Sequence, residues 1–272
     1  MTARQNDTAE QAAQPDAARR YVDTHVHLHA VFDVVRFFDA AAAHFAAAGA
    51  GGHDGVLCLA EVAGAGAFER LRERGQAGPW RFVPRGRCGL VAERGDGVGV
   101  GVVAGRQVRC DNGLEVLGIG EPLDDVADGR GFEATVASVR ERGALTVVPY
   151  GVGKWTGKRG AQVRRLIEAG PKDVAYGDNG GRVGWGETAL LKRARAHGRT
   201  VLVGTDPLAQ GRGEARAGSW GVVTPVVDGH GADDGWAERV VAALRGVGPA
   251  GETFGRRLGA VAGVVQQIGA RL

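Results

Sequence analysis

The sequence is poor in cysteine. Three residues of this type, Cys58, Cys88 and Cys110, occur in a chain of 272, and no two of them form a Cys-x-x-Cys pair. Such a sparse, odd set excludes a disulfide-stabilised scaffold and is typical of structural thiols in a reducing compartment. We therefore expect a cytoplasmic protein whose cysteines are reduced and take no part in metal binding.

Long apolar runs are also missing. The longest, residues 40–52, is rich in alanine and is interrupted by His44, so the sequence predicts no membrane-spanning helix and no membrane partner. Residues 1–20 are polar and lack the apolar core of a signal peptide. We expect them to form a disordered tail in front of a single domain over residues 21–272.

Charge of one sign does not dominate. The chain has 34 lysines and arginines against 31 acidic residues, a formal net charge of +3, and the two signs are interspersed. This pattern is typical of a mixed, solvated surface and gives no specific indication of nucleic-acid binding. Hydrophobic residues make up 44% of the chain, enough to form the core of one large α/β domain.

Apolar runs of strand length alternate with segments of helical periodicity along most of the chain. This alternation predicts a mostly parallel sheet with its chemistry at the carboxyl ends of the strands. Between residues 80 and 120, Asp-Gly and Asn-Gly turns separate β-like runs and predict an antiparallel meander. The predicted strands are 21–29, 55–62, 81–84, 89–93, 98–110, 114–120, 145–150, 173–177 and 200–204. The predicted helices are 31–48, 68–74, 133–142, 162–169, 188–197, 236–247 and 261–272.

Residues 21–29 carry the strongest candidate site. As a strand, this segment places Asp23, His25, His27 and His29 on one face, because side chains alternate with period two. His25 and His27 then lie roughly 7 Å apart along the strand, close enough to share one metal ion. A His-x-His pair at the end of a buried strand suits zinc, manganese or iron. The alternative is a polar strand end whose histidines hydrogen-bond to loops.

Ionisable or amide side chains follow other predicted strands. They are Glu61, Lys154, Asp178 with Asn179, and Asp206. Histidines and carboxylates that converge at one sheet edge are the ligands of a hydrolytic metal centre. Structural alternatives stay open, because Glu61 could be a surface acid, Asp178 with Asn179 a turn, and Asp206 the N-cap of a helix.

Cations gather after the same strands. Lys154, Lys158 and Arg159 lie among glycines, and Arg182 follows the predicted strand 173–177. Glycine-rich backbone together with lysine and arginine side chains suits phosphate oxygens. We therefore expect a small anionic, phosphorylated substrate bound by Lys154, Arg159, Arg182 and Asn179. The alternative is that these cations are solvated residues at helix starts.

The order of these motifs resembles that of the polymerase-and-histidinol-phosphatase (PHP) class of metal-dependent phosphoesterases, over roughly residues 21–225. Residues 23–27 (DTHVH) resemble the opening D-x-H-x-H of that family, and residues 114–118 (LEVLG) resemble one of its strands. Residues 173–182 resemble its strand and Asn-Gly-Arg turn, and residues 204–208 (GTDPL) resemble its late Gly-Ser-Asp-Ala-His. The resemblance implies a distorted (β/α)7, TIM-like barrel, here with an antiparallel β meander inserted.

The resemblance also implies bound divalent metal, up to three ions in the family. In this chain His25, His27 and Asp206 match family ligands. Residues 105–107 (GRQ) stand where the family has a glycine followed by a ligand glutamate, and Leu208 stands in place of the final histidine. The implied centre therefore holds about one divalent transition metal ion per chain.

The function that follows is a metal-dependent hydrolase, specifically a phosphoesterase that uses a metal-activated water. Glu61 or Asp178 would complete the ligand shell and, with Asp206, take part in catalysis. Two alternatives stay open. The first is a barrel that has lost its chemistry and binds or regulates a ligand. The second is an amidohydrolase acting on a neutral C–N substrate, since that superfamily shares the His-x-His strand and a late aspartate.

Overall fold

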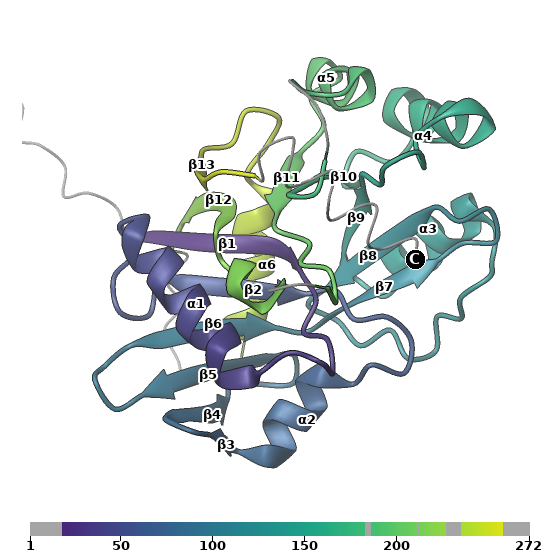
Figure 1. Cartoon of the computed structure of the whole chain (residues 1–272). Helices are drawn as coiled ribbons and strands as arrows, with labels where there is room; N and C mark the ends of the chain where they lie inside the picture. Colours follow the sequence, from purple (N-terminus) through teal and green to yellow (C-terminus); the bar gives the residue numbers. More distant parts are fainter. Residues whose placement is uncertain (1–17, 183–185, 211–212, 227–234, 258–272) are drawn as a thin grey trace, which may run out of the picture.

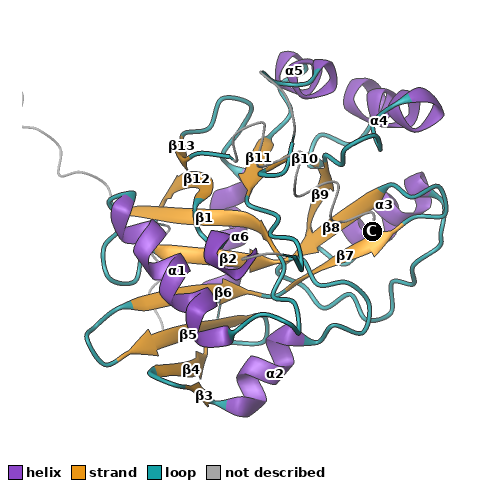
Figure 2. Ribbon diagram, viewed as in Figure 1, coloured by secondary structure: helices purple, strands orange, loops and turns teal. Residues whose placement is uncertain are grey.

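Two mixed β-sheets of eight and five strands carry the structure (Figures 1 and 2). This computed structural model describes residues 18–182, 186–210, 213–226 and 235–257. In chain order the strands are β1 (Arg19–Val26), β2 (Gly55–Leu59), β3 (Gln76–Ala77), β4 (Trp80–Pro84), β5 (Gly89–Arg94), β6 (Gly99–Val103), β7 (Gly105–Arg109), β8 (Glu115–Ile119), β9 (Leu145–Pro149), β10 (Ala175–Asn179), β11 (Val201–Gly204), β12 (Trp220–Pro225) and β13 (Thr253–Gly255). The first sheet has the order β13-β12-β1-β2-β6-β5-β4-β3, and the second has the order β11-β10-β9-β8-β7.

Helices cover the outer face of each sheet and the space between the sheets. They are α1 (Val34–Ala47), α2 (Ala67–Arg74), α3 (Phe132–Glu141), α4 (Gly157–Ala169), α5 (Ala189–Ala196) and α6 (Trp236–Arg245), with a short 3-10 turn, η1 (Gly213–Arg216). The buried face of α1 joins a core with β1, β2 and β4–β6, while α3, α4 and α5 pack on the second sheet. Buried side chains of α6 share a core with strands of both sheets. This arrangement of layers differs from the ring of helices around a barrel that the sequence resemblance implied.

The predicted TIM-like barrel is wrong, because the described strands form two separate sheets and do not close. Between β1 and β11, side chains take the place of a backbone ladder. The hydroxyl of Thr24 donates to the carbonyl of Val203 at 3.0 Å, and the backbone N–H of Thr205 donates to the carboxylate of Asp23 at 2.9 Å. Polar side chains directed at the neighbouring strand therefore join the two sheets here, along what we call the seam between β1 and β11.

The chain passes from one sheet to the other at Ala104. The backbone N–H of Ala104 donates to the carbonyl of Cys88 in the loop before β5, and its carbonyl accepts from Gly120 just after β8. The predicted strand 98–110 is consequently two strands in different sheets. Both predicted hairpins exist, since β5 pairs with β6 and β7 pairs with β8 in antiparallel fashion, but the meander is divided between the sheets.

Most other predicted elements agree with the structure within a few residues. The helix 31–48 is confirmed as α1, which begins after Asp33, whose side chain accepts the backbone N–H of Arg36. The sequence prediction missed β3, β12 and β13. The predicted helix 261–272 and residues 1–17 of the predicted tail lie outside the described residues. The predicted tail is too long, because Arg19 and Arg20 already belong to β1.

Two further expectations concern membrane-spanning helices and the state of the cysteines. None of the helices in the described part of the chain has the length and apolar character that crossing a bilayer requires. Cys58, Cys88 and Cys110 are free and buried. Burial raises the pKa of both Cys88 and Cys110 to about 11, so neither thiol forms the reactive thiolate near neutral pH.

Candidate metal centre

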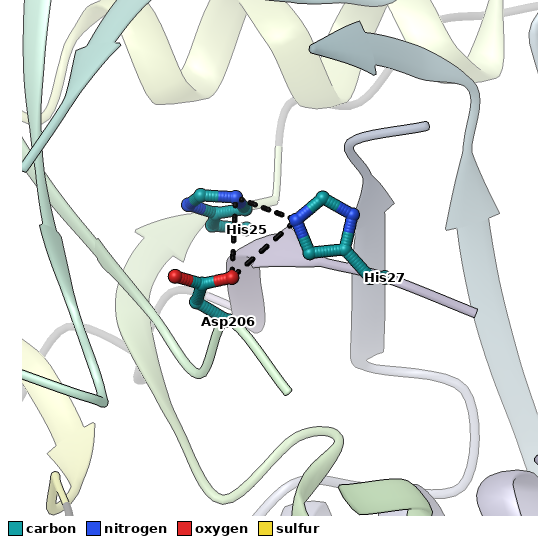
Figure 3. A group of neighbouring side chains, drawn as sticks. All are labelled: His25, His27 and Asp206. Atoms are coloured by element: carbon teal, nitrogen blue, oxygen red, sulfur yellow. Dashed lines mark hydrogen bonds and ion pairs between the residues drawn. The ribbon is translucent and has the colours of Figure 1, made fainter. Parts of the chain in front are cut away.

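Strand β1 and the residue just after it bring two imidazole rings together. The ring atoms Nε2 of His25 and Nε2 of His27 are 3.2 Å apart, and both side chains are buried (Figure 3). The pairing of β1 with β2 is irregular between Asp23 and Val26, where β1 ends. His29 does not join the pair, because its ring bonds to the carbonyl of Pro207 at 3.0 Å.

Asp206 enters the same space from the end of β11. Its Oδ1 atom lies 3.3 Å from Nε2 of His27 and 3.7 Å from Nε2 of His25 (Figure 3). Asp206 has φ 45°, the left-handed region, and no other non-glycine among the described residues has a positive φ. Aspartate tolerates this region at a cost of roughly 1–2 kcal/mol. A hydrogen bond of 2.8 Å from its backbone N–H to the carbonyl of His25 holds it across the seam.

The geometry of the three side chains fits a transition metal. A tetrahedral ion bound at about 2.0–2.1 Å by nitrogen and oxygen separates its ligand atoms by roughly 3.3 Å. The three distances between the donor atoms of His25, His27 and Asp206, 3.2, 3.3 and 3.7 Å, are of that size. Two imidazoles and one carboxylate also match the ligand preferences of zinc, manganese and iron. This group could therefore hold one metal ion.

The protonation states suit metal binding. Burial lowers the pKa of His25, which favours the neutral ring that a metal requires, although the charge of Asp206 opposes the shift. Burial by itself would raise the pKa of Asp206, but the neighbouring His25 and His27 outweigh it and hold that pKa below its usual range. At neutral pH the group then combines a neutral His25 with an ionised carboxylate.

Two buried polar residues orient the three donors. The Asn179 side chain at the end of β10 donates to Oδ2 of Asp206 at 2.8 Å and to the carbonyl of Tyr150 at 2.7 Å. The carboxylate of Asp23 accepts from the backbone N–H and the hydroxyl of Thr205, at 2.9 and 2.6 Å, and from the N–H of Gly218 at 3.0 Å. Asn179 therefore fixes the carboxylate of Asp206, and Asp23 fixes the backbone on both sides of the seam.

The structure places Glu61 and Asp178 in other interactions. The carboxylate of Glu61 accepts the backbone N–H groups of Ala67 and Phe68, at 2.9 and 2.5 Å, at the start of α2. The buried carboxylate of Asp178 forms two hydrogen bonds, of 2.6 and 2.8 Å, with the guanidinium of Arg182. Neither carboxylate belongs to the group of three donors, and their roles as ligands stay predictions, as does anion binding by Arg182.

Lys154 lies near the three donors, together with residues that the sequence prediction did not name, whereas the guanidinium of Arg159 donates to the backbone carbonyls of Asn112 and Gly153. Lys154 forms an ion pair with Glu115 of β8, and its charge lowers the pKa of Asp206. The charge of Glu115 and the side chain of Gln107 in β7 both act to raise the pKa of His25, against the effect of burial. The signal that could have found Gln107 and Glu115 is the alternation of faces in the hairpin that contains them.

No helix begins at Asp206 in the described part of the chain. Residues 205–210 have no helical structure, and the next element, η1, starts at Gly213. The alternative that Asp206 is a helix N-cap is therefore not what the structure shows. Its carboxylate faces the two imidazoles instead (Figure 3).

Comparison with known proteins identifies the fold. No protein-family model matches the sequence, and no curated protein matches it. PsfC from Pseudomonas syringae PB-5123 has a similar structure, with a TM-score of 0.57 and 16% identity over 93% of this chain and 98% of PsfC. The likeness establishes a shared fold. The lesion-specific endonuclease PfuEndoQ from Pyrococcus furiosus is also similar, with a TM-score of 0.52 and 15% identity over 86% of this chain and 57% of the endonuclease.

Proposed function

We propose that the protein is a metal-dependent hydrolase of phosphoesters. The observation that carries the proposal is the triangle of buried donor atoms from His25, His27 and Asp206, whose sides match the spacing of ligands around one transition metal ion. The sequence resemblance to PHP phosphoesterases supports the reaction class. The fold shared with an endonuclease, an enzyme that cleaves phosphodiester bonds, supports it as well.

Each residue of the centre has a defined part in this proposal. His25, His27 and Asp206 would hold about one zinc, manganese or iron ion per chain, which when bound supplies Lewis-acid activation of water and of a phosphoryl oxygen. Asn179 keeps the carboxylate of Asp206 turned toward the histidines. Glu61 could join the ligands only by releasing the two backbone N–H groups at the start of α2.

Lys154 supports an anionic substrate. Its ammonium group is half-buried and lies close enough to Asp206 to lower the pKa of that carboxyl. Glu115 neutralises part of this charge, so Lys154 would share its donors between Glu115 and a phosphate oxygen. We propose Lys154 and Arg159 as the phosphate-binding residues of a small phosphorylated substrate.

The test is hydrolysis of p-nitrophenyl phosphate and bis(p-nitrophenyl) phosphate by protein loaded with zinc, manganese or iron. We expect metal-dependent release of nitrophenol that a chelator stops and added metal restores. Bound metal with hydrolysis of a neutral amide alone would point to the amidohydrolase alternative. Bound metal with no hydrolysis of any substrate would point to a ligand-binding or regulatory protein.

Lys154→Ala should weaken the binding of inorganic phosphate. Loss of a charge-assisted contact costs roughly 1.5–3 kcal/mol, or about ten- to hundredfold in affinity. The change also leaves Glu115 without its cation, which acts in the same direction. Isothermal titration calorimetry measures the difference, with Lys172→Ala, at an exposed lysine after α4, as the control. Equal phosphate affinity in wild type and Lys154→Ala would exclude Lys154 as a phosphate-binding residue.

A further inference from the structure

A small cavity of about 190 Å³ lies where the loop between β9 and α4 meets the start of α5. Residues between 150 and 156 line it from one side and residues 188–190 from the other. These segments follow β9 and β10, so the cavity lies beyond the carboxyl ends of these two strands. None of the described residues that line it is charged, and none is a proposed metal ligand.

The N-termini of two helices border this cavity. Thr156, the residue before α4, and Thr188, the residue before α5, both line it, and the two helices pack side by side (Figure 1). Each helix N-terminus carries a partial charge of roughly +0.5, so the two ends together supply about one unit of positive charge. Neither α4 nor α5 has an acidic residue in its first turn that would cancel this charge.

The first backbone N–H groups of both helices can donate to a ligand. A helix leaves its first N–H groups without partners inside the helix. No side chain caps α4, because the hydroxyl of Thr156 donates to a carbonyl of its own loop at 2.9 Å instead. In α5 the hydroxyl of Thr188 accepts the N–H of Leu191 at 3.3 Å, which leaves the N–H groups of Ala189 and Leu190 for another acceptor.

Trp155 gives an independent indication of a ligand. It lines the cavity, and its side chain is buried, with 7% of the residue exposed. Its indole N–H has no hydrogen-bond partner among the described residues. A buried donor is rarely left unpaired in a native structure, so an acceptor bound in the cavity would satisfy it. The ring of Tyr150, edge-on to that of Trp155 at 5.5 Å, supports the indole in this position.

We propose that this cavity binds a small oxyanion such as inorganic phosphate. Its donors are the N-terminal N–H groups of α4 and α5 and the indole N–H of Trp155, a set that suits an anion whose charge is spread over several oxygens. The volume is below the roughly 300–1,000 Å³ of pockets for larger organic ligands, which restricts the site to a small anion. The inference goes beyond the proposed hydrolase and does not depend on it.

The test places a negative charge at the cavity without disturbing α5. Ala189 is the exposed first residue of α5 and lines the cavity, so Ala189→Asp puts a carboxylate beside the bound anion. Aspartate is favourable in the first turn of a helix, so the variant should fold. Ala189→Asn is the matched control, with the same size and no charge. Isothermal titration calorimetry with inorganic phosphate compares the two in full-length protein carrying Lys154→Ala, a change that weakens the phosphate site proposed beside the metal centre.

We expect Ala189→Asn to bind phosphate and Ala189→Asp to bind it at least tenfold more weakly, because like charges at short range repel each other. Arg164→Gln changes the net charge by the same one unit at an exposed position of α4 outside the cavity, and should leave the affinity unchanged. Trp155→Phe keeps an aromatic ring and removes the indole N–H, so it should weaken binding by about tenfold.

Three results decide the inference. Equal phosphate affinity in Ala189→Asp and Ala189→Asn, or no phosphate binding by the Lys154→Ala protein, would overturn the site. Unchanged affinity in Trp155→Phe, with the protein folded by circular dichroism, would overturn the role of the indole. Phosphate binding that Ala189→Asp weakens, in a protein that carries no metal, would support the site and contradict only the proposed hydrolase.

Discussion

Replacing both His25 and His27 with alanine is expected to leave the protein without bound metal. The change removes two of the three donors and leaves Asp206 as a single carboxylate, which cannot hold a transition metal ion tightly. The loss of affinity should exceed the roughly 10- to 100-fold that follows from removing an outer hydrogen-bond partner of a ligand. The metal content of protein purified from metal-replete cells, measured by elemental analysis, should then fall from about one ion per chain to none, since metal affinity depends on the ligands present.

The control for this variant is His197→Ala, which removes an exposed histidine after α5 and should leave the metal content unchanged. Because both replaced rings are buried, circular dichroism and thermal melting must accompany the metal analysis to show that the double variant is folded. A folded double variant that still carries one ion per chain would place the metal elsewhere. Wild-type protein that is folded and metal-free would contradict the proposed hydrolase itself.

Asp206→Asn is expected to abolish hydrolysis and to weaken metal binding while the fold persists. Asparagine keeps the size of the side chain and tolerates the left-handed backbone found at this position. Its side-chain oxygen can still accept the hydrogen bond from Asn179. What it lacks is the negative charge that a divalent ion requires. The measurements are metal content, nitrophenol release and the midpoint of thermal unfolding.

Asp206→Gly supplies the matched control for backbone strain. Glycine adopts φ 45° without steric cost, so this variant relieves the left-handed strain and removes the carboxylate together. If the carboxylate acts as a ligand, both variants lose metal although their stabilities differ. Unchanged metal content and hydrolysis in Asp206→Asn would show that the negative charge at this position does not contribute to metal binding.

The secondary structure was largely predictable because local patterns determine it. The helical spacing of apolar residues predicted α1, and the Asp-Gly and Asn-Gly turns predicted both hairpins. The division into two sheets was not predictable. Residues 98–110 read as one continuous β run, and only long-range hydrogen bonds of Ala104 with Cys88 and Gly120 show that the chain changes sheets there.

The candidate metal centre was partly predictable, because the carboxyl ends of neighbouring strands lie close together. His25 lies near the end of β1, His27 directly follows β1, and Asp206 follows β11 across the seam, so their donor atoms meet as the strand-end rule requires. The proximity of Gln107 and Glu115 to His25 was not predicted, because it depends on how an antiparallel hairpin lies against the end of β1. The partners of Asp178 and Glu61 were likewise set by tertiary contacts, with Arg182 in one case and the start of α2 in the other.

A metal ion bound at the seam between β1 and β11 would have a mechanical effect on the molecule. His25 and His27 come from the first sheet and Asp206 from the end of the second, and no backbone ladder joins the two sheets there. An ion held by all three is therefore a cross-link between halves of the molecule, and its binding free energy resists their separation. At a thousandfold excess of free metal over Kd this adds about 4 kcal/mol to the free energy of unfolding. Resistance to heat would then follow the metal supply of the cell.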